Sequence, residues 1–219
     1  MNKASRWIVD LLLPPRCVLC RRFLESSGQT LCGRCSHDLP EHELPVKSVP
    51  YIKKTAAPFH YEGLIREAIL RYKFESIRAY SRQFAIWMTE RIKAELDGMF
   101  ELITWVPCSR RRKWVRGYDQ SELLAKELSV LLQVPCRRLL RKVRHTPKQS
   151  RQRDAAARRA NVLGAYATIA PEKILGKRIL LVDDILTTGA TLSECGKMLC
   201  MAGADDPVCA VIAAVRQKA

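Results

Sequence analysis

The sequence predicts an α/β fold, with a mostly parallel sheet flanked by helices and a small cysteine-rich region in front of it. From Tyr51 onward, strand-like and helix-like patterns alternate, as in folds whose parallel strands are joined by helices. Ahead of that point, four cysteines form two C-x-x-C pairs. At 219 residues the chain holds one ordinary domain and a small appendage. We therefore expect residues 1–48 to hold a helix and the cysteine pairs, and residues 49–219 to form the α/β domain.

Individual elements are predicted from the period at which apolar residues recur. Residues 41–50 combine charges with prolines and are predicted to be a linker. Residues 141–160 are densely charged and have no apolar period, so we expect a mobile loop there. The expected helices are 3–13, 62–72, 79–96, 117–132 and 190–201, and the expected strands are 102–106, 161–168, 178–182 and 208–215.

The cysteine pairs predict a metal site. Cys17 and Cys20 are separated from Cys32 and Cys35 by eleven residues. Each pair can fold as a tight knuckle that presents both sulfurs to one ion, and two knuckles complete a tetrahedral four-sulfur site. Because four thiolates fill the coordination sphere, we expect a structural zinc. Paired disulfides and a redox-active C-x-x-C are the alternatives, but an odd total of nine unevenly spaced cysteines favours metal.

Positive charge is concentrated in one segment. The formal charge of the chain is +16, and residues 108–159 hold sixteen Lys and Arg against four acids, a net +12. Such a field attracts polyanions, either a pyrophosphate group or a nucleic-acid backbone, although a solvated basic face is the alternative. The residues predicted to form a nucleic-acid surface are Arg110, Arg111, Arg112, Lys113, Arg141, Lys142, Arg144, Lys148, Arg151 and Arg153.

Apolar runs in the sequence are short. None approaches the roughly 18 to 20 residues of a membrane-spanning helix. Lys3 and Arg6 precede an apolar stretch, but Asp10 interrupts it and no small-residue cleavage site follows before Pro14. We therefore predict a cytoplasmic protein without a membrane span.

The most informative segment runs from Ile179 to Thr191, with the sequence Ile-Leu-Leu-Val-Asp-Asp-Ile-Leu-Thr-Thr-Gly-Ala-Thr. Its continuous apolar run predicts a strand buried on both faces. Two aspartates end this strand, and a turn containing Thr and Gly opens a helix. At the carboxyl end of a parallel strand, such a turn directs backbone N–H groups and a helix N-terminus at one point, which suits a phosphate.

Polar groups in this segment divide into two sets. Gly189 permits positive φ and close approach of a ligand, and the threonine hydroxyls add donors. Asp183 and Asp184 can accept strong hydrogen bonds from two ribose hydroxyls. A diol on the carboxylates and a phosphate on the loop together describe a ribose 5-phosphate, whereas an Asp-capped helix after a buried strand explains only the apolar run. The predicted binding residues are Asp183, Asp184, Thr187, Thr188, Gly189, Ala190 and Thr191.

Further short motifs accompany this segment and the cysteine pairs. They are Tyr61-Glu-Gly63, Tyr72-Lys73-Phe74, Val106-Pro107, Arg116-Gly117-Tyr118-Asp119-Gln120, Gln149, Arg158-x-x-Asn161-Val162 and Val215-Arg216. With them, nearly the whole chain resembles the ComF family of competence proteins, and the segment itself is similar to the binding fingerprint of type I phosphoribosyltransferases. The resemblance implies a double zinc ribbon fused to a type I phosphoribosyltransferase fold that binds 5-phosphoribosyl-1-pyrophosphate (PRPP) with magnesium. It also implies a role with incoming DNA, alongside a DNA-uptake helicase or channel protein.

The resemblance also places a pyrophosphate loop after the strand 102–106. Its residues are Pro107, Cys108, Ser109 and Arg110, with Arg116 close by in sequence. Two positions depart from the family pattern. Cys108 stands where an aliphatic residue is usual, and Asp119 replaces the Asn of the Arg-Gly-aromatic-Asn-Gln motif. Because Asp119 and Glu122 have the spacing of a capping box, we assign Asp119 to helix capping rather than to ligand binding.

Two functions remain open from the sequence. One is a PRPP-binding module in DNA uptake, whose basic surface holds single-stranded DNA mainly through phosphates, since only Trp114 and Tyr118 interrupt that surface. The other is an active phosphoribosyltransferase of nucleotide metabolism, in which a nitrogen acceptor displaces pyrophosphate from PRPP with the help of magnesium. The sequence carries no recognisable nucleobase pocket, and position 2 is Asn rather than a cysteine nucleophile. We favour the binding module.

Overall fold

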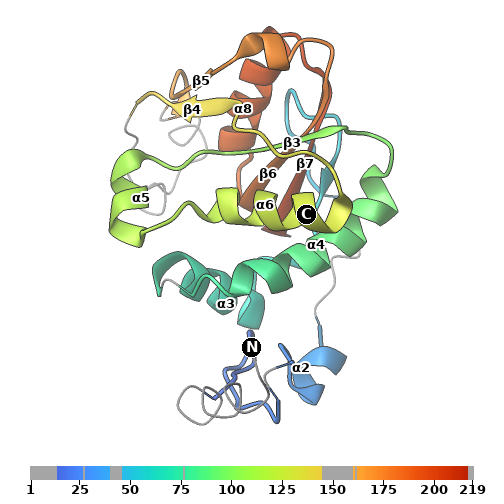
Figure 1. The fold of residues 1–219 in the computed structure, drawn as a ribbon, viewed down its shortest axis with the longest axis vertical. Coiled ribbons are helices and arrows are strands. Elements are labelled where there is room, and N and C mark those ends of the chain that lie inside the picture. The colour runs from blue at the N-terminus through green and yellow to red at the C-terminus, as the bar shows by residue number, and fades with distance from the viewer. Residues whose placement is uncertain are drawn as a thin grey trace.

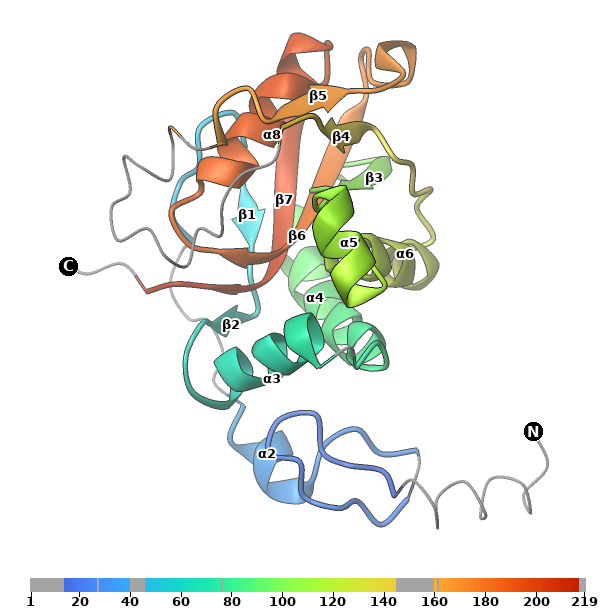
Figure 2. The same ribbon diagram turned by 90° about the vertical axis from the view of Figure 1, so that its left-hand side faces the viewer.

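The computed structural model describes residues 14–26, 28–39, 46–75, 77–144, 160 and 162–216. Within these residues the main element is a five-stranded sheet in which every pairing is parallel. Its order is β1-β7-β6-β3, with β2 also paired to β7 (Figures 1 and 2). The strands are β1 (Thr55–Ala56), β2 (Phe59–His60), β3 (Leu102–Trp105), β6 (Arg178–Leu186) and β7 (Asp205–Ala214). The predicted α/β class with a parallel sheet is confirmed.

Helices cover both faces of this sheet. Leu180 and Val182 of β6 pack with α3 (Gly63–Phe74), α4 (Tyr80–Leu96) and α6 (Gln120–Leu132). Ile179 and Leu181 point to the other face and pack with α8 (Ala190–Met201). All four side chains are fully buried. This is why the apolar run of β6 has no polar alternation.

A second, smaller sheet lies beside α8. It pairs β4 (Leu140–Lys142) with β5 (Tyr166–Thr168) in antiparallel register, and we call it the small sheet. Leu140 and Tyr166 are buried in the same core cluster as α8, which fixes the small sheet against the main domain. A short 3-10 helix, η2 (Pro171–Lys173), leads from it towards β6.

The cysteine region packs against α3 at the end of the molecule farthest from α8 (Figures 1 and 2). It contains an isolated antiparallel bridge between Arg16 and Phe23 and the short helix α2 (Gly33–His37). Val18 and Leu19, between the first two cysteines, are buried in the same cluster as α3 and α4. The two parts of the chain therefore share one continuous core.

Several predicted boundaries are wrong for identifiable reasons. β6 continues to Leu186, so both aspartates lie inside the strand and do not end it. The helix expected from residue 117 begins at Gln120, because Gly117, at φ 76°, ends a separate helix, α5 (Arg110–Arg116). β7 begins at Asp205, and the strand expected over 161–168 is limited to Tyr166–Thr168. β4 occupies the first residues of the expected loop 141–160.

Other expectations fall outside the described residues. These are the helix 3–13, the first half of the linker (residues 41–45) and the loop residues 145–159. Among the residues that are described, no helix is both long enough and apolar enough to cross a bilayer.

Candidate functional site

A cavity of about 810 Å³ opens at the carboxyl edge of the main sheet. Its floor is the end of β6 together with the segment Thr187–Thr191, which we call the phosphate loop. The walls come from the C-terminal end of α3, from α5 and from the small sheet. All seven residues predicted to bind a ribose 5-phosphate line this one cavity.

The two aspartates on the floor have different partners. Lys73, at the end of α3, places its Nζ 2.8 Å from Asp184 Oδ2, and both side chains are less than one-fifth exposed. Asp183 Oδ1 accepts hydrogen bonds from Ser121 Oγ and from the Asp184 amide, each at 2.9 Å. Burial, together with the neighbouring Asp184 charge, raises the pKa of Asp183 to about 7. One acid therefore pairs with a cation, while the pKa of the other lies near neutrality.

The phosphate loop has the backbone shape that an anion site needs. Gly189 is the N-cap of α8 and has a φ of 80°, a conformation that favours glycine. A Cβ added there would lie 3.2 Å from Val49 Cγ2, so the space is also restricted. Gly189 has no side chain to cap the helix, and the first residues of α8, Ala190 and Thr191, line the cavity, so a helix N-terminus borders the ligand space.

Helix α5 forms the basic wall of the cavity. Arg111, Arg112 and Arg116 line it, together with Pro107 and Cys108 from the expected pyrophosphate loop. Arg116 donates to Gln120 Oε1 at 2.8 Å, and its guanidinium lies 4.9 Å from the centre of the Phe74 ring.

The remaining two residues of the expected pyrophosphate loop have other places. Ser109 Oγ caps α5 by accepting from the Arg112 amide at 3.3 Å. Arg110 is exposed and lies outside the lining of the cavity.

Asp119 is a capping residue, as its spacing from Glu122 predicts. It is the N-cap of α6, and its carboxylate accepts from the amides of Glu122 and Cys108. The Cys108 contact, at 2.8 Å, ties the beginning of the α5 segment to its end. Glu122 does not complete the reciprocal half of a capping box, since its carboxylate pairs with Lys113 and Lys126.

Lys142 lies in the cavity and not with the exposed arginines among which the sequence placed it. Its Nζ donates to the Tyr166 hydroxyl at 3.1 Å, and burial lowers the pKa of Lys142 to about 8, helped by the nearby Arg112 charge. Asp183 is the carboxylate whose charge acts in the opposite direction and raises this pKa. A half-buried ammonium with no ion pair among the described residues is a ready partner for a ligand anion.

Sequence reasoning therefore missed Lys73, Ser121 and Tyr166 as site residues. Lys73 lies in one of the recognised motifs, Tyr72-Lys73-Phe74, which was the one signal that could have found it. Of the predicted nucleic-acid surface, Arg110, Arg111, Lys113, Arg141 and Arg144 are exposed, while Lys148, Arg151 and Arg153 lie outside the described residues.

The four predicted metal ligands come together. The Sγ atoms of Cys17, Cys20, Cys32 and Cys35 all lie within 4.8 Å of one another, and the Cys20 and Cys32 sulfurs are 3.6 Å apart. Tetrahedral zinc with Zn–S bonds of about 2.3 Å requires sulfurs separated by about 3.8 Å. The backbone N–H of Cys35 lowers the pKa of Cys32 to about 7, which favours the thiolate that binds metal. These residues fit a structural zinc.

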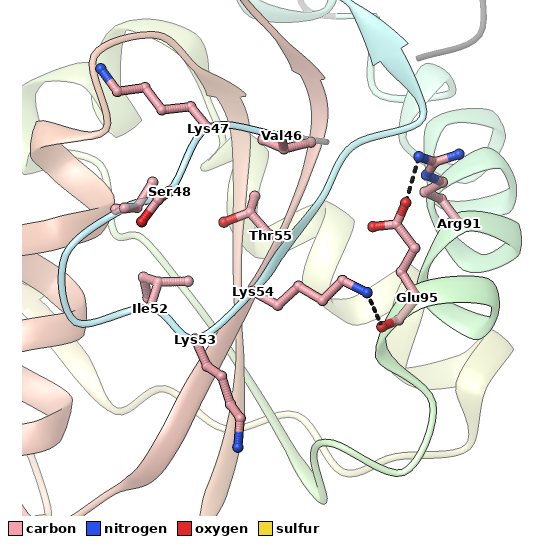
Figure 3. A pocket seen from close by; sticks show the side chains of 10 residues that line it. Val46, Lys47, Ser48, Ile52, Lys53, Lys54, Thr55, Arg91 and Glu95 are labelled. Carbon is pink, nitrogen blue, oxygen red and sulfur yellow. Dashed lines mark hydrogen bonds and ion pairs between the residues drawn. The ribbon is translucent and has the colours of Figure 1, made fainter. Parts of the chain in front are cut away.

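A second cavity, of about 430 Å³, lies at the amino end of β1 (Figure 3). Three of its four cations already have partners: Lys54 donates to the Glu95 carbonyl, Arg91 pairs with the Glu95 carboxylate, and Lys53 pairs with Asp206. Lys47 and Lys53 point away from each other, so no set of cations converges on one ligand. We assign no binding site there.

Two family models match the chain. Residues 8–61 match a double zinc ribbon domain, and residues 119–219 match a phosphoribosyl transferase domain. The first match contains all four clustered cysteines, and the second contains Asp183, Asp184 and the phosphate loop.

Similar proteins align along most of the chain. Competence protein F of Haemophilus influenzae is 28% identical over 87% of this chain and 93% of its own length. DNA utilization protein YhgH of Escherichia coli O6:H1 is 28% identical, over 86% and 85% respectively. Competence protein ComFC of Bacillus subtilis is 25% identical, over 88% and 82%. Glutamine phosphoribosylpyrophosphate amidotransferase from B. subtilis aligns in structure with a TM-score of 0.46 and 20% identity, over 65% of this chain and 30% of that one.

Proposed function

From the premise that this chain joins a double zinc ribbon to a phosphoribosyltransferase domain and is homologous to competence protein F, ComFC and YhgH, we propose that it is a cytoplasmic PRPP-binding protein of DNA uptake or utilisation. One observation carries the PRPP proposal. Two adjacent carboxylates and a glycine-containing helix N-terminus face the same cavity, which matches a ribose diol and its 5-phosphate.

The rest of the cavity suits the pyrophosphate of PRPP. Arg112 and Arg116 on one wall and Lys142 on another provide positive charge beyond the two aspartates. Lys73 neutralises Asp184, so the floor is less repulsive to a polyanionic ligand than two free carboxylates would be. A strongly anionic ligand that also carries a diol is therefore preferred over a simple phosphate.

Magnesium fits the same acids. Ser121 and the Asp184 amide bind Asp183 at Oδ1, and Lys73 binds Asp184 at Oδ2. The second oxygen of each carboxylate, Asp183 Oδ2 and Asp184 Oδ1, therefore has no partner among the described residues. Carboxylate oxygens are ligands that magnesium prefers, directly or through its water shell. When bound with PRPP, magnesium would neutralise phosphate charge. The protein's own contribution is to orient the ribose hydroxyls and to hold the pyrophosphate at its cations.

The proposed role with DNA rests on the names of the relatives and on the exposed cations of α5. We propose that these cations bind single-stranded DNA through its phosphates, near a helicase or channel that delivers the strand. Binding of this kind is independent of sequence and falls steeply with salt.

Calorimetry tests the central proposal. PRPP with magnesium should bind at one site, and ribose 5-phosphate should compete more weakly because it lacks the pyrophosphate. Binding that is absent, or that the Asp183 and Asp184 substitutions described below leave unchanged, would contradict the proposal.

A second candidate function is catalytic transfer of the phosphoribosyl group. The observation that favours it is the volume of the cavity, about 810 Å³, which leaves room for an acceptor beside PRPP. Release of pyrophosphate, measured across a panel of nitrogen acceptors, separates the two functions. A turnover that depends on the acceptor would support the enzyme, and binding without turnover would support the module.

A further inference from the structure

Helix α5 carries an aromatic residue that the fold does not use. Trp114 is 86% exposed, whereas Trp87 and Trp105 are 6% and 7% exposed. The helix, with the sequence RRRKWVR, has no buried residue. Burial of a tryptophan is strongly favourable, so a ring left this exposed is available to a binding partner.

The helix is held by its ends and not by Trp114. Ser109 caps its start, and Gly117 ends it in a left-handed conformation while its carbonyl accepts from Arg78 at 2.9 Å. The amide of Cys108 donates to Asp119, which closes the base of the segment. Figures 1 and 2 show α5 standing apart from the main sheet, between the small sheet and α3. It is a fixed support that presents an aromatic ring to solvent.

Cations surround this ring. Arg110 lies four positions before Trp114 and Arg111 three, so both share its side of the helix. Neither forms an ion pair with the described part of the chain, and Lys113 is more than half exposed although it pairs with Glu122. Arg111, Arg112, Val115 and Arg116 line the cavity, although Arg111 is also exposed, whereas Arg110 and Lys113 lie outside that lining. The outer side of α5 therefore combines an aromatic face with positive charges that have room for phosphates.

We propose that Trp114 is a stacking platform for a base of single-stranded nucleic acid, whose phosphates bind Arg110 and Lys113. This inference rests on the proposed DNA role and assigns its first base contact. Stacking on an aromatic ring tolerates every base, and it requires a strand whose bases are unpaired. A second copy of the chain is disfavoured as the partner, because a symmetric contact here would bring two sets of cations together.

Oligothymidylate and an abasic oligonucleotide of equal length separate stacking from charge. At low salt, Trp114→Ala should weaken binding of oligothymidylate by about 5- to 150-fold, the effect of losing one stacked base. The same substitution should leave the affinity for the abasic strand unchanged. Trp114→Phe should restore most of the loss, since it keeps an aromatic face. Met201→Ala, at a 73% exposed position on α8, is the matched control and should bind like the original protein.

The outcomes distinguish a stacking role of Trp114 from the DNA role as a whole and from a contact between copies. If Trp114→Ala binds oligothymidylate as tightly as the original protein, or loses the same factor with the abasic strand, the stacking role is wrong and the DNA role stands. If neither strand binds the original protein at low salt, the DNA role fails and the stacking role fails with it. If Trp114→Ala changes only the sedimentation of the protein, the ring belongs to a contact between copies.

Discussion

Arg71 and Lys73 lie two positions apart on α3, and Arg71 contacts the cysteine region while Lys73 contacts the floor of the ligand cavity. The Arg71 guanidinium, only 8% exposed, donates to the backbone carbonyls of Val18 and Leu19, between the first two zinc ligands. Lys73 pairs with Asp184 on the floor of the ligand cavity. One helix therefore contacts both the first knuckle and the predicted ribose site.

We predict that PRPP slows the transfer of zinc from the protein to a chelator. Ligand binding at Asp184 should hold Lys73 and α3 in place, and α3 in turn holds the first knuckle through Arg71, so the zinc site should open less often. Arg71→Met should remove this coupling and speed release, because two buried carbonyls lose their donor at a cost of about 1 to 3 kcal/mol. A chromogenic chelator follows the release.

Arg66→Met, at an exposed position of the same helix, is the control and should keep the coupling. Equal release rates with and without PRPP, under conditions where calorimetry shows PRPP bound, would disprove a link through α3.

Zinc itself should be structural. Cys17→Ser or Cys32→Ser should lower the metal content from about one equivalent towards zero and destabilise the cysteine region, because metal binding contributes its folding free energy. Metal analysis and thermal unfolding measure the two effects. Cys136→Ser, outside the cluster, should retain full metal. Full zinc in either ligand variant would show that the four sulfurs do not form one site.

The acids of the floor should control ligand affinity. Asp184→Ala removes a charged acceptor for a ribose hydroxyl and should weaken binding of PRPP with magnesium by about 1.5 to 3 kcal/mol. Asp183→Ala should also weaken it. Calorimetry measures both. Because Asp184→Ala frees Lys73 to attract phosphate, the double variant Lys73→Met/Asp184→Ala shows the loss without that compensation. Unchanged affinity in both single variants would mean that PRPP binds elsewhere.

The sequence predicts the floor of this site better than its walls. β6, the phosphate loop and α8 are local features, because an apolar run, a glycine and a helical period follow one another along the chain. The Lys73–Asp184 pair joins positions far apart in sequence, and no periodic pattern of residues predicts it. Helix α5 was missed because RRRKWVR has no apolar face, and its ends are set by Ser109 and Gly117. The position of Lys142 depends on how the small sheet packs.

Affinity for PRPP should depend on pH through two groups. The pKa of Asp183 is about 7, so its carboxylate becomes protonated, and loses acceptor strength, as the pH falls below 7. The pKa of Lys142 is about 8, so its positive charge is lost as the pH rises above 8. Binding should therefore be tightest between about pH 7 and 8. Calorimetry across this range should give a bell-shaped profile.

Two substitutions test which group causes each limb of that pH profile. Lys142→Met should flatten the alkaline limb, and Asp183→Asn should flatten the acidic limb. The phosphates of PRPP also titrate below neutrality, near pH 6. Because the original protein and Asp183→Asn bind the same ligand, any difference between their pH profiles comes from the protein. If Lys142→Met keeps the full alkaline decline, Lys142 does not contact the ligand.

Salt dependence should separate the two sides of α5. Each Lys or Arg that meets a phosphate of single-stranded DNA contributes about 0.7 to the magnitude of the logarithmic salt slope. Reversing Arg110, Arg111 and Arg112 to Glu should weaken binding uniformly across sequences and flatten the slope, with zinc content unchanged. Since Arg111 and Arg112 line the cavity and Arg110 does not, the triple variant should also lose PRPP. Arg110→Glu/Lys113→Glu should instead lose DNA and keep PRPP.

A pair of titrations decides between a shared and a divided surface. If PRPP displaces DNA from the original protein and the Arg110→Glu/Lys113→Glu variant binds DNA normally, the strand enters the cavity and competes for Arg111 and Arg112. If PRPP leaves bound DNA in place, the outer side of α5 holds the strand while the inner side holds pyrophosphate. DNA affinity that the triple reversal leaves untouched would place the nucleic-acid surface elsewhere, and the cations of α5 would then serve the PRPP cavity alone.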